Sequence, residues 1–413
     1  MKRYQKTKIS QYLILGLILI SLAAAGFASM FVMQRVPFED HFVLNWAAGR
    51  AWLLEGINPY DETAILQRAE EAVEGSRFLA TLPDETVQLN PLLNLVFYLP
   101  FSLIPFQISR MLWVMALTIG VLLISYLSLL IANWKISTTA KIIILLAGLL
   151  WIPGIATIIT GQLSPIVILL VLVSLYLFLQ EQDNAAGFIL ALTSGSFYIT
   201  GLVIILFITY AIIKRRWSLI TAYGAGLAFL IIVSLLLLPT WPRDWLIIVV
   251  ENYENLNLVQ TPLMTLASLL PGIEDFLSIL LHIIFGTFYI FLLIRLRSKS
   301  ERIFVWNALA VLVVASLLNI RGSAAYLFLL LPAILLVFRF LTERLGLFGR
   351  IITWIFIVLL VTIPWYASLP VEMITVSSSL STMVIWLPIL VIIGMNWIRW
   401  WAVKIPKLPF ESS

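Results

Sequence analysis

The residues best suited to chemistry lie together in one polar stretch near the start of the chain. Glu39 and Asp40 are adjacent carboxylates, and His41 follows them directly. A carboxylate within hydrogen-bonding reach of an alcohol can accept its proton while the oxygen forms a new bond. We predict that Asp40 is such a general base, with Glu39 as the alternative if the register differs by one. His41 is a candidate for assisting the base or binding the acceptor, against the alternative of a solvated surface residue.

The chain around this stretch is strongly apolar. Of its 413 residues 62% are hydrophobic and only 11% are charged, which is too little polar material to cover a soluble globule. Apolar runs of roughly 20 residues, the length that crosses a bilayer, recur from end to end. We therefore expect an all-α polytopic membrane protein, one integral membrane domain over residues 1–413, with about 10–13 transmembrane segments.

The expected helices place the polar stretch just after the first of them. That helix covers 11–33, and residues 34–90 form a large loop in which short amphipathic helices lie on the membrane surface. A second external loop is expected over 239–262. The other expected helices cover 110–132, 140–158, 163–180, 186–213, 218–238, 276–294, 303–320, 323–338, 351–369 and 380–398.

Charge gives these elements an orientation. Residues 34–90 hold ten of the 21 acidic residues against four arginines, whereas basic residues cluster in short loops such as Lys214–Arg216. Under the positive-inside rule the first loop is extracytoplasmic and both termini are cytoplasmic, in a multi-pass protein of the cell membrane. The net charge of +5 is therefore a topology signal and does not predict a nucleic-acid partner.

The path of residues 91–213 has two solutions. Either 91–106 crosses the membrane and 186–213 is one helix, or 91–106 is re-entrant and 186–213 consists of two half-spans separated at Ser194–Ser196. We favour the second, because it leaves Lys135 and Lys141 inside and the Gly161–Gln162 turn outside.

The motifs of the first loop resemble those of a known family. The segment EDHFVLNWAAGRAWLLEGINPYD is similar to the first-loop signature of glycosyltransferase family 87, in the GT-C class: an acidic residue after the first helix, an Ala-rich helix, then Gly-x-Asn-Pro-Tyr. NPLLNLVFYLPFSLIPF resembles the proline-bearing second segment, and GQLSPIVILLVL the Gly-Gln turn before a helix. AAGFILALTSGSFYITGLVIILF and IRGSAAYLFLLLPAILLV resemble later blocks.

This resemblance implies a GT-C-like bundle and a glycosyltransferase. The members that it resembles move a hexose, mannose, from a polyprenyl-phosphate-sugar donor to an acceptor hydroxyl at the extracytoplasmic face, with the first-loop carboxylate as base. The implied partners are that donor, a lipid or glycan acceptor of the cell envelope, and membrane lipids. The alternatives are a carrier or flippase for lipid-linked sugars, and a catalytically inactive relative.

The leaving phosphate needs a cation or hydrogen-bond donors. The family pattern has a lysine followed by proline where this chain has Phe197 and Tyr198. Arg321, expected at the outer end of a span, is the best remaining cation because an arginine fork binds phosphate; the alternative is an interfacial arginine. The further donor-site candidates are Tyr198, Gln162 and Arg243, and the candidates for acceptor or loop contacts besides His41 are Arg50, Asn58 and Tyr60.

Other kinds of site are not indicated. The chain has no Gly-rich phosphate loop, which argues against a soluble nucleotide-sugar donor. With two histidines and no cysteine we expect no metal site and no cofactor. A divalent cation held by Glu39, Asp40 and Asp61 is the alternative.

Overall fold

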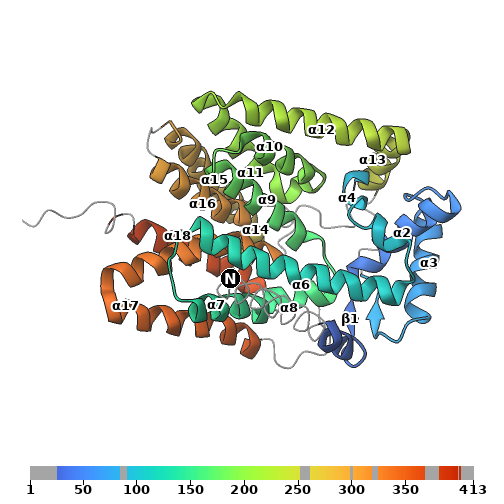
Figure 1. Cartoon of the computed structure of the whole chain (residues 1–413), viewed down its shortest axis with the longest axis horizontal. Coiled ribbons are helices and arrows are strands. Elements are labelled where there is room, and N and C mark those ends of the chain that lie inside the picture. Colours follow the sequence, from blue (N-terminus) through green and yellow to red (C-terminus); the bar gives the residue numbers. More distant parts are fainter. Residues whose placement is uncertain are drawn as a thin grey trace, which may run out of the picture.

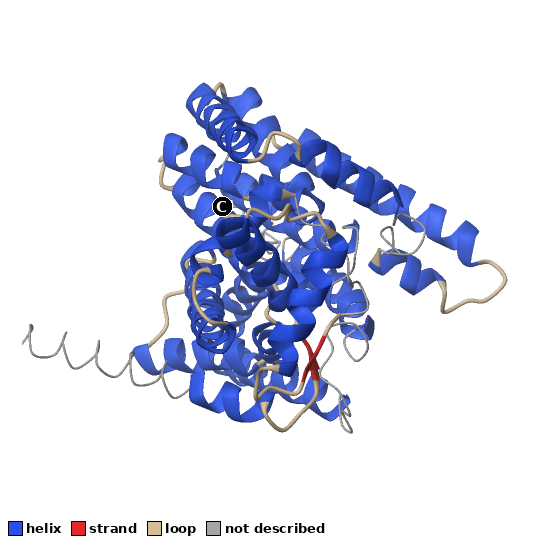
Figure 2. Cartoon of the chain, turned by 90° about the vertical axis from the view of Figure 1, so that its right-hand side faces the viewer, coloured by secondary structure: helices blue, strands red, loops and turns tan. Residues whose placement is uncertain are grey.

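The computed structural model describes residues 26–83, 91–251, 261–297, 301–318, 324–367, 381–398 and 400, and it is almost entirely helical (Figures 1 and 2). In chain order the elements are β1 (Phe38–Glu39), α2 (His41–Glu55), α3 (Glu62–Glu74), β2 (Ala80–Thr81), α4 (Leu92–Leu95), α5 (Leu99–Ser102), α6 (Phe106–Ile131), α7 (Thr138–Leu150), α8 (Ile152–Thr160), α9 (Ser164–Leu179), α10 (Asp183–Leu192), η1 (Ser194–Ser196), α11 (Phe197–Lys214), α12 (Trp217–Leu237), α13 (Trp241–Glu251), α14 (Pro262–Ala267), α15 (Glu274–Arg295), α16 (Glu301–Leu318), η2 (Ala324–Leu330), α17 (Leu331–Ala367) and α18 (Ser381–Ile398).

Long apolar helices confirm the expected class of all-α polytopic membrane protein. Within the described ranges, five helical stretches are long and apolar enough to cross a membrane, or six if α7 and α8, bent by 54°, form one span. The five cover Phe106–Ile131, Ser194–Lys214, Trp217–Leu237, Glu274–Arg295 and Ala325–Trp365. Shorter apolar helices, among them α9 and α18, pack beside them. The full number of ten to thirteen segments stays a prediction.

The last of these stretches is two helices joined by a kink. Gly346 lies inside α17 with φ 57° and ψ −123°, a conformation that no helix continues through. Because glycine lacks Cβ, it adopts positive φ at little cost. The kink divides α17 into two arms, in agreement with the separate helices expected over 323–338 and 351–369.

The segment from α10 to α11 turns back on itself. The Nε atom of Arg216, just after α11, donates to Oδ2 of Asp183, the first residue of α10, at 2.8 Å. The two ends of the segment therefore lie at the same end of the bundle, with η1 between the helices at the turn. Residues 91–106 hold only the four-residue helices α4 and α5. The break at Ser194–Ser196 is therefore present, while Ser194–Lys214 alone has the length of a span, and the second path considered above stays a prediction.

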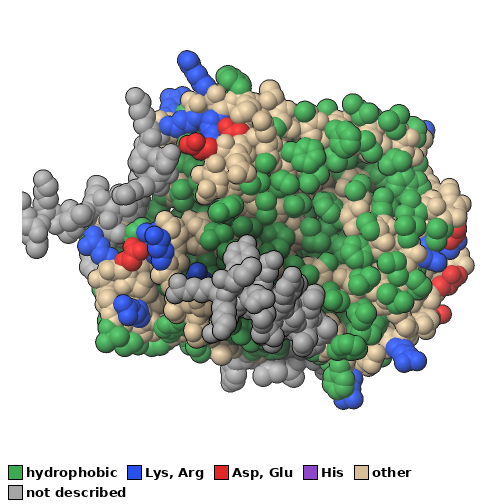
Figure 3. Space-filling view, viewed as in Figure 1, with side chains coloured by type: hydrophobic (Ala, Val, Ile, Leu, Met, Phe, Trp, Pro, Cys, Tyr) green, Lys and Arg blue, Asp and Glu red, His purple; other side chains and the backbone are tan. Residues whose placement is uncertain are grey.

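The polar elements gather at one end of the molecule. In Figure 1, α2, α3 and α13 lie at the right, while α17 kinks at the left. Figure 3 shows a mostly hydrophobic face between these ends, with charged side chains near its margins. This arrangement is that of a membrane-embedded bundle with a polar cap, and the cap carries the first-loop acids.

Helix α2 differs from the expected amphipathic surface helix. Nine of its residues are buried, among them every residue from Phe42 to Gly49. Just before it, β1 pairs in parallel with β2, with Phe38 opposite Ala80 and Glu39 opposite Thr81 (red in Figure 2). The entry to α2 is thereby held inside the protein, so α2 packs as a core helix. Helix α3, which buries only Ile65 and Ala69, does lie at the surface.

Small residues bring α10 and α12 into close contact. A Cβ atom at Gly187 would clash with the backbone carbonyl oxygen of Leu219, and one at Gly226 would lie 3.0 Å from the Cβ of Ala191. Apolar helices in a membrane gain little from hydrophobic burial against each other, so close backbone approach at small residues contributes much of their association.

We predict that Gly187→Ala lowers the thermal unfolding temperature of the purified protein in detergent, because the added methyl forces α10 away from α12. The expected cost is about 1–3 kcal/mol. Gly224→Ala in α12 is the matched control, since no atom lies within 4 Å of its added Cβ. Equal unfolding temperatures for the two variants would contradict the close packing.

Candidate active site

Asp40 is fully buried at the start of α2. It is the N-cap residue, with φ −108° and ψ 99°, and its Oδ1 accepts the backbone N–H of Phe42 at 2.9 Å. Its own N–H donates to the carbonyl oxygen of Thr81, which extends the β1–β2 pairing by one bond. Aspartate is favoured at this position because its carboxylate satisfies an N–H group that has no partner within the helix.

A buried arginine neutralises this carboxylate. The Nε atom of Arg110, near the start of α6, donates to Oδ2 of Asp40 at 2.8 Å, and both side chains are 0% exposed. The Nη2 atom of Arg110 donates to the carbonyl oxygen of Ile159 near the end of α8. Its Nη1 atom is buried without a hydrogen-bond partner. The guanidinium thus connects the β1–α2 junction, α6 and α8. One of its N–H groups, at Nη1, has no acceptor.

The end of α8 reaches this pair because its last turn closes on a glycine. Gly161 has φ +72°, and a Cβ there would lie 2.9 Å from the Cβ of Phe42 and 3.1 Å from Cζ of Arg110. Nε1 of Trp113 donates to the Gly161 carbonyl oxygen at 2.9 Å. The Gly161–Gln162 turn expected from the sequence is therefore present, and half-buried Gln162 directly follows the glycine that approaches Arg110.

Glu39 and His41, which flank Asp40, are more accessible. Their side chains are 18% and 30% exposed, and Oε2 of Glu39 lies 3.8 Å from Nε2 of His41. Three consecutive polar residues thus divide between two environments, with Asp40 inside and its neighbours at the edge. Glu39 is thus partly accessible to solvent, whereas Asp40 becomes available only if the side chains around it separate.

Burial and charge act in opposite directions on Asp40. Desolvation raises its pKa above the ordinary value, while the charge and hydrogen bond of Arg110, together with the N–H groups of Phe42 and Val43, lower it. Desolvation is the largest of these effects, so the net direction is upward. A raised pKa brings a carboxylate closer to the range in which a general base works well near neutral pH.

A second polar group lies where the family pattern has its lysine. Oγ of Ser196, in η1, donates to Oδ1 of Asn94 in α4 at 3.2 Å. Tyr198, two residues further on, is within electrostatic range of Tyr98, which also senses Asp40 and Arg110. Tyr198, Asp40 and Arg110 therefore all lie within electrostatic range of one aromatic side chain, Tyr98.

The remaining sequence candidates lie elsewhere. Nδ2 of Asn58 donates to Oδ2 of Asp244 in α13 at 2.7 Å, and its Oδ1 accepts the N–H of Tyr60 at 3.0 Å. Burial raises the pKa of the Tyr60 hydroxyl. Arg243, beside Asp244, is exposed. The hydrogen bond from Asn58 to Asp244 connects the first loop to α13.

Arg50 has a local role in packing. Its Nη1 donates to the carbonyl oxygen of Ser102 at 3.2 Å, and its guanidinium lies 5.4 Å from the ring centroid of Trp46. These contacts connect α2 to α5. Arg321 lies outside the described residues.

Arg110 is the site residue that sequence reasoning missed. An arginine five residues into a long apolar helix is a signal in itself, since ionisable groups inside membrane segments are costly and usually paired. The described part of the chain has no group of three or more His, Cys, Asp or Glu side chains that could hold a metal ion.

We predict that Arg110→Met costs the protein about 3–5 kcal/mol of stability, because it leaves a buried carboxylate without its partner. The double variant Asp40→Asn/Arg110→Met should be less destabilised than the sum of the two single variants. Denaturant unfolding in detergent measures both, with Arg50→Met as the control, because Arg50 forms no ion pair with a described carboxylate. Additive losses would show that the pair is not coupled.

Comparison with known proteins places this chain in a family. The model for glycosyltransferase family 87 matches residues 89–320, more than half of the chain. The matched range contains Arg110, Gln162, Tyr198 and Arg243 and begins after the first loop, so Glu39 and Asp40 precede it. No curated protein matches the chain. With its apolar helices and this match, the chain belongs to glycosyltransferase family 87 and is a membrane glycosyltransferase.

Proposed function

We propose that the protein transfers a hexose, mannose, from a polyprenyl-phosphate-linked donor to an acceptor hydroxyl at the extracytoplasmic face of the cell membrane. Family membership supports the transfer of a sugar. The observation that carries the proposal is the Asp40–Arg110 pair, because it sets a carboxylate base beside a cation with an unused N–H group.

The proposed step is a direct displacement with inversion. The acceptor oxygen attacks the anomeric carbon, its proton passes to Asp40, and the bond from that carbon to the phosphate oxygen breaks. The electron pair leaves with the polyprenyl phosphate, which Arg110 and Arg321 stabilise by charge and hydrogen bonds. Gln162 and Tyr198 are the proposed donor contacts nearest to this pair, and Arg243 is a more distant one.

Access decides between the two carboxylates. Asp40 has the cation and the raised pKa, but it is fully buried, so the acceptor must enter by separating α2 from α6 or α8. Catalytic hydrogen bonds often form only in the substrate complex, so a closed unliganded site does not disqualify Asp40. Glu39 is the alternative base, with His41 beside it. Arg50, Asn58 and Tyr60 would then support the loop and not the reacting atoms.

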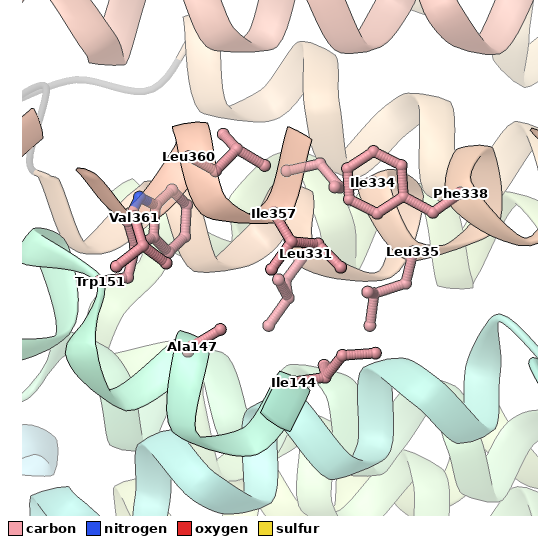
Figure 4. Close-up of a pocket in the computed structure, with 11 residues that line it drawn as sticks. Ile144, Ala147, Trp151, Leu331, Ile334, Leu335, Phe338, Ile357, Leu360 and Val361 are labelled. Atoms are coloured by element: carbon pink, nitrogen blue, oxygen red, sulfur yellow. The ribbon is translucent and has the colours of Figure 1, made fainter. Parts of the chain in front are cut away.

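A lipid-linked donor is supported by an apolar groove between α7 and α17 (Figure 4). The groove is partly open, has a cavity volume of about 40 Å³, and is lined by hydrophobic side chains and Gly148, including Ile144, Trp151, Leu335 and Ile357. Trp151 directly precedes α8, whose nine residues end at the Asp40–Arg110 pair. At 1.5 Å per residue the groove and the pair are roughly 13 Å apart along α8. A prenyl chain in the groove would therefore bring its phosphate toward Arg110.

We predict that Asp40→Asn lowers sugar transfer by about 10²–10⁴-fold, since an amide accepts no proton at neutral pH. The assay uses proteoliposomes, labelled polyprenyl-phosphate mannose and a membrane extract as the source of acceptors. Glu39→Gln is the matched control and should retain most activity. The reverse pattern assigns the base to Glu39, and full activity of both variants removes the first-loop acids from the mechanism.

Two further measurements separate chemistry from folding and donor type. Binding of the labelled donor to Asp40→Asn should persist, because the base acts on the acceptor. Polyprenyl-phosphate glucose and a nucleotide sugar, tested in parallel, should be poor donors. If the nucleotide sugar is the better donor, the lipid-linked assignment is wrong.

We also predict that Ala147→Phe, which fills the groove, raises KM for a long-chain donor more than for a short-chain analogue. Leu146→Phe on the same helix is the control, because Leu146 is exposed and does not line the groove. Equal KM changes for the two donors would place the prenyl chain elsewhere.

A further inference from the structure

A second pocket lies at the other end of the bundle, between α15, α16 and α18. It is a partly open cavity of about 40 Å³ that joins an apolar wall, which includes Phe288, Leu292 and Ile392, to two polar side chains, Arg295 and Asn396. Neither polar side chain belongs to the transfer site. The pocket therefore has the composition of an amphiphile site, with charge at one end and hydrocarbon surface along the rest.

Arg295 has no carboxylate partner among the described side chains. It is half-buried in the last turn of α15, and its Cζ lies 5.3 Å from the ring centroid of Phe291. Arg297 follows it and is exposed. Contact with an aromatic ring orients a guanidinium through its flat face. The N–H groups at its edge stay available to bind an anion.

The position of Arg295 fixes the depth of the pocket. Helix α15 has 22 residues, about 33 Å of helix, which matches the hydrocarbon thickness of a bilayer. Glu274 and Asp275 begin the helix and Arg295 ends it. Only 11% of the α15 span is buried within the protein, so the helix faces lipid along most of its length. Arg295 accordingly lies at head-group depth, in the leaflet of the basic loops.

We propose that this pocket binds an anionic phospholipid, with its phosphate on Arg295 and Asn396 and an acyl chain along Phe288, Leu292 and Ile392. Basic pockets between membrane helices suit anionic head groups. Arg295 offers positive charge, and none of the described side chains that line the pocket is a carboxylate that would receive the cation of a choline or ethanolamine head group. The pocket thus selects net negative charge and not phosphate alone.

Native mass spectrometry of the full-length protein, delipidated in detergent and titrated with phosphatidylglycerol or phosphatidylcholine, tests this site. We expect phosphatidylglycerol to bind more tightly, and Arg295→Gln to weaken it about tenfold, the effect of losing one charge-assisted hydrogen bond. Arg297→Gln is the matched control: it removes the same charge from the same helix end, outside the pocket. If both variants lost similar affinity for phosphatidylglycerol, the binding would depend on diffuse surface charge, and the proposal would be wrong.

Variants of the apolar wall provide an independent test. Ala310, on α16, lines the pocket, and Ala310→Phe should fill it and reduce phosphatidylglycerol binding while Arg295 stays intact. Arg295→Lys keeps the positive charge but loses the paired N–H groups of the guanidinium, so it should bind phosphatidylglycerol with intermediate affinity. This variant also provides the test if Arg295→Gln does not fold. Unchanged binding in Ala310→Phe, or equal affinity for phosphatidylcholine, would show that no lipid occupies this pocket as proposed.

Discussion

The buried ion pair between Asp40 and Arg110 is the interaction on which the polar end of this protein depends. A lone charge in such an environment is very costly, and it is tolerated only when an opposite charge and further hydrogen bonds accompany it. Here the pair fixes the entry to α2, the first turns of α6 and the end of α8 relative to one another. The apolar bundle provides the scaffold, and this single contact determines where its chemically capable residues meet.

Glycines and other small residues allow the close contacts between helices in this arrangement. Gly161 allows α8 to end directly against Phe42 and Arg110, and Gly187 allows α10 to pack on α12 and turn back toward the site. In both places a side chain would collide with backbone or with the guanidinium. The site and the fold therefore share one constraint, which is that helix ends approach more closely than larger residues permit.

The molecule also has two kinds of polar site at opposite ends. The first-loop acids lie with α2, α3 and α13 at one end, while Arg295 ends its helix on the side of the basic loops. A lipid-linked substrate needs an apolar path leading to the acidic end, which the groove between α7 and α17 supports. A structural lipid needs only a cation at head-group depth, as in the pocket beside α15.

The sequence by itself determined the membrane class, most helix positions, the break at Ser194–Ser196 and, through loose motifs, the family. These depend on hydropathy, turn residues and charge clusters, which are local along the chain. Only the tertiary structure decided that Asp40 is buried, that Arg110 is its partner seventy positions away, and that α2 is a core helix. A single sequence cannot specify such a pair, because the contact depends on how distant helices pack: the position of Arg110 in an apolar helix indicates that it has a partner, but not which residue that partner is.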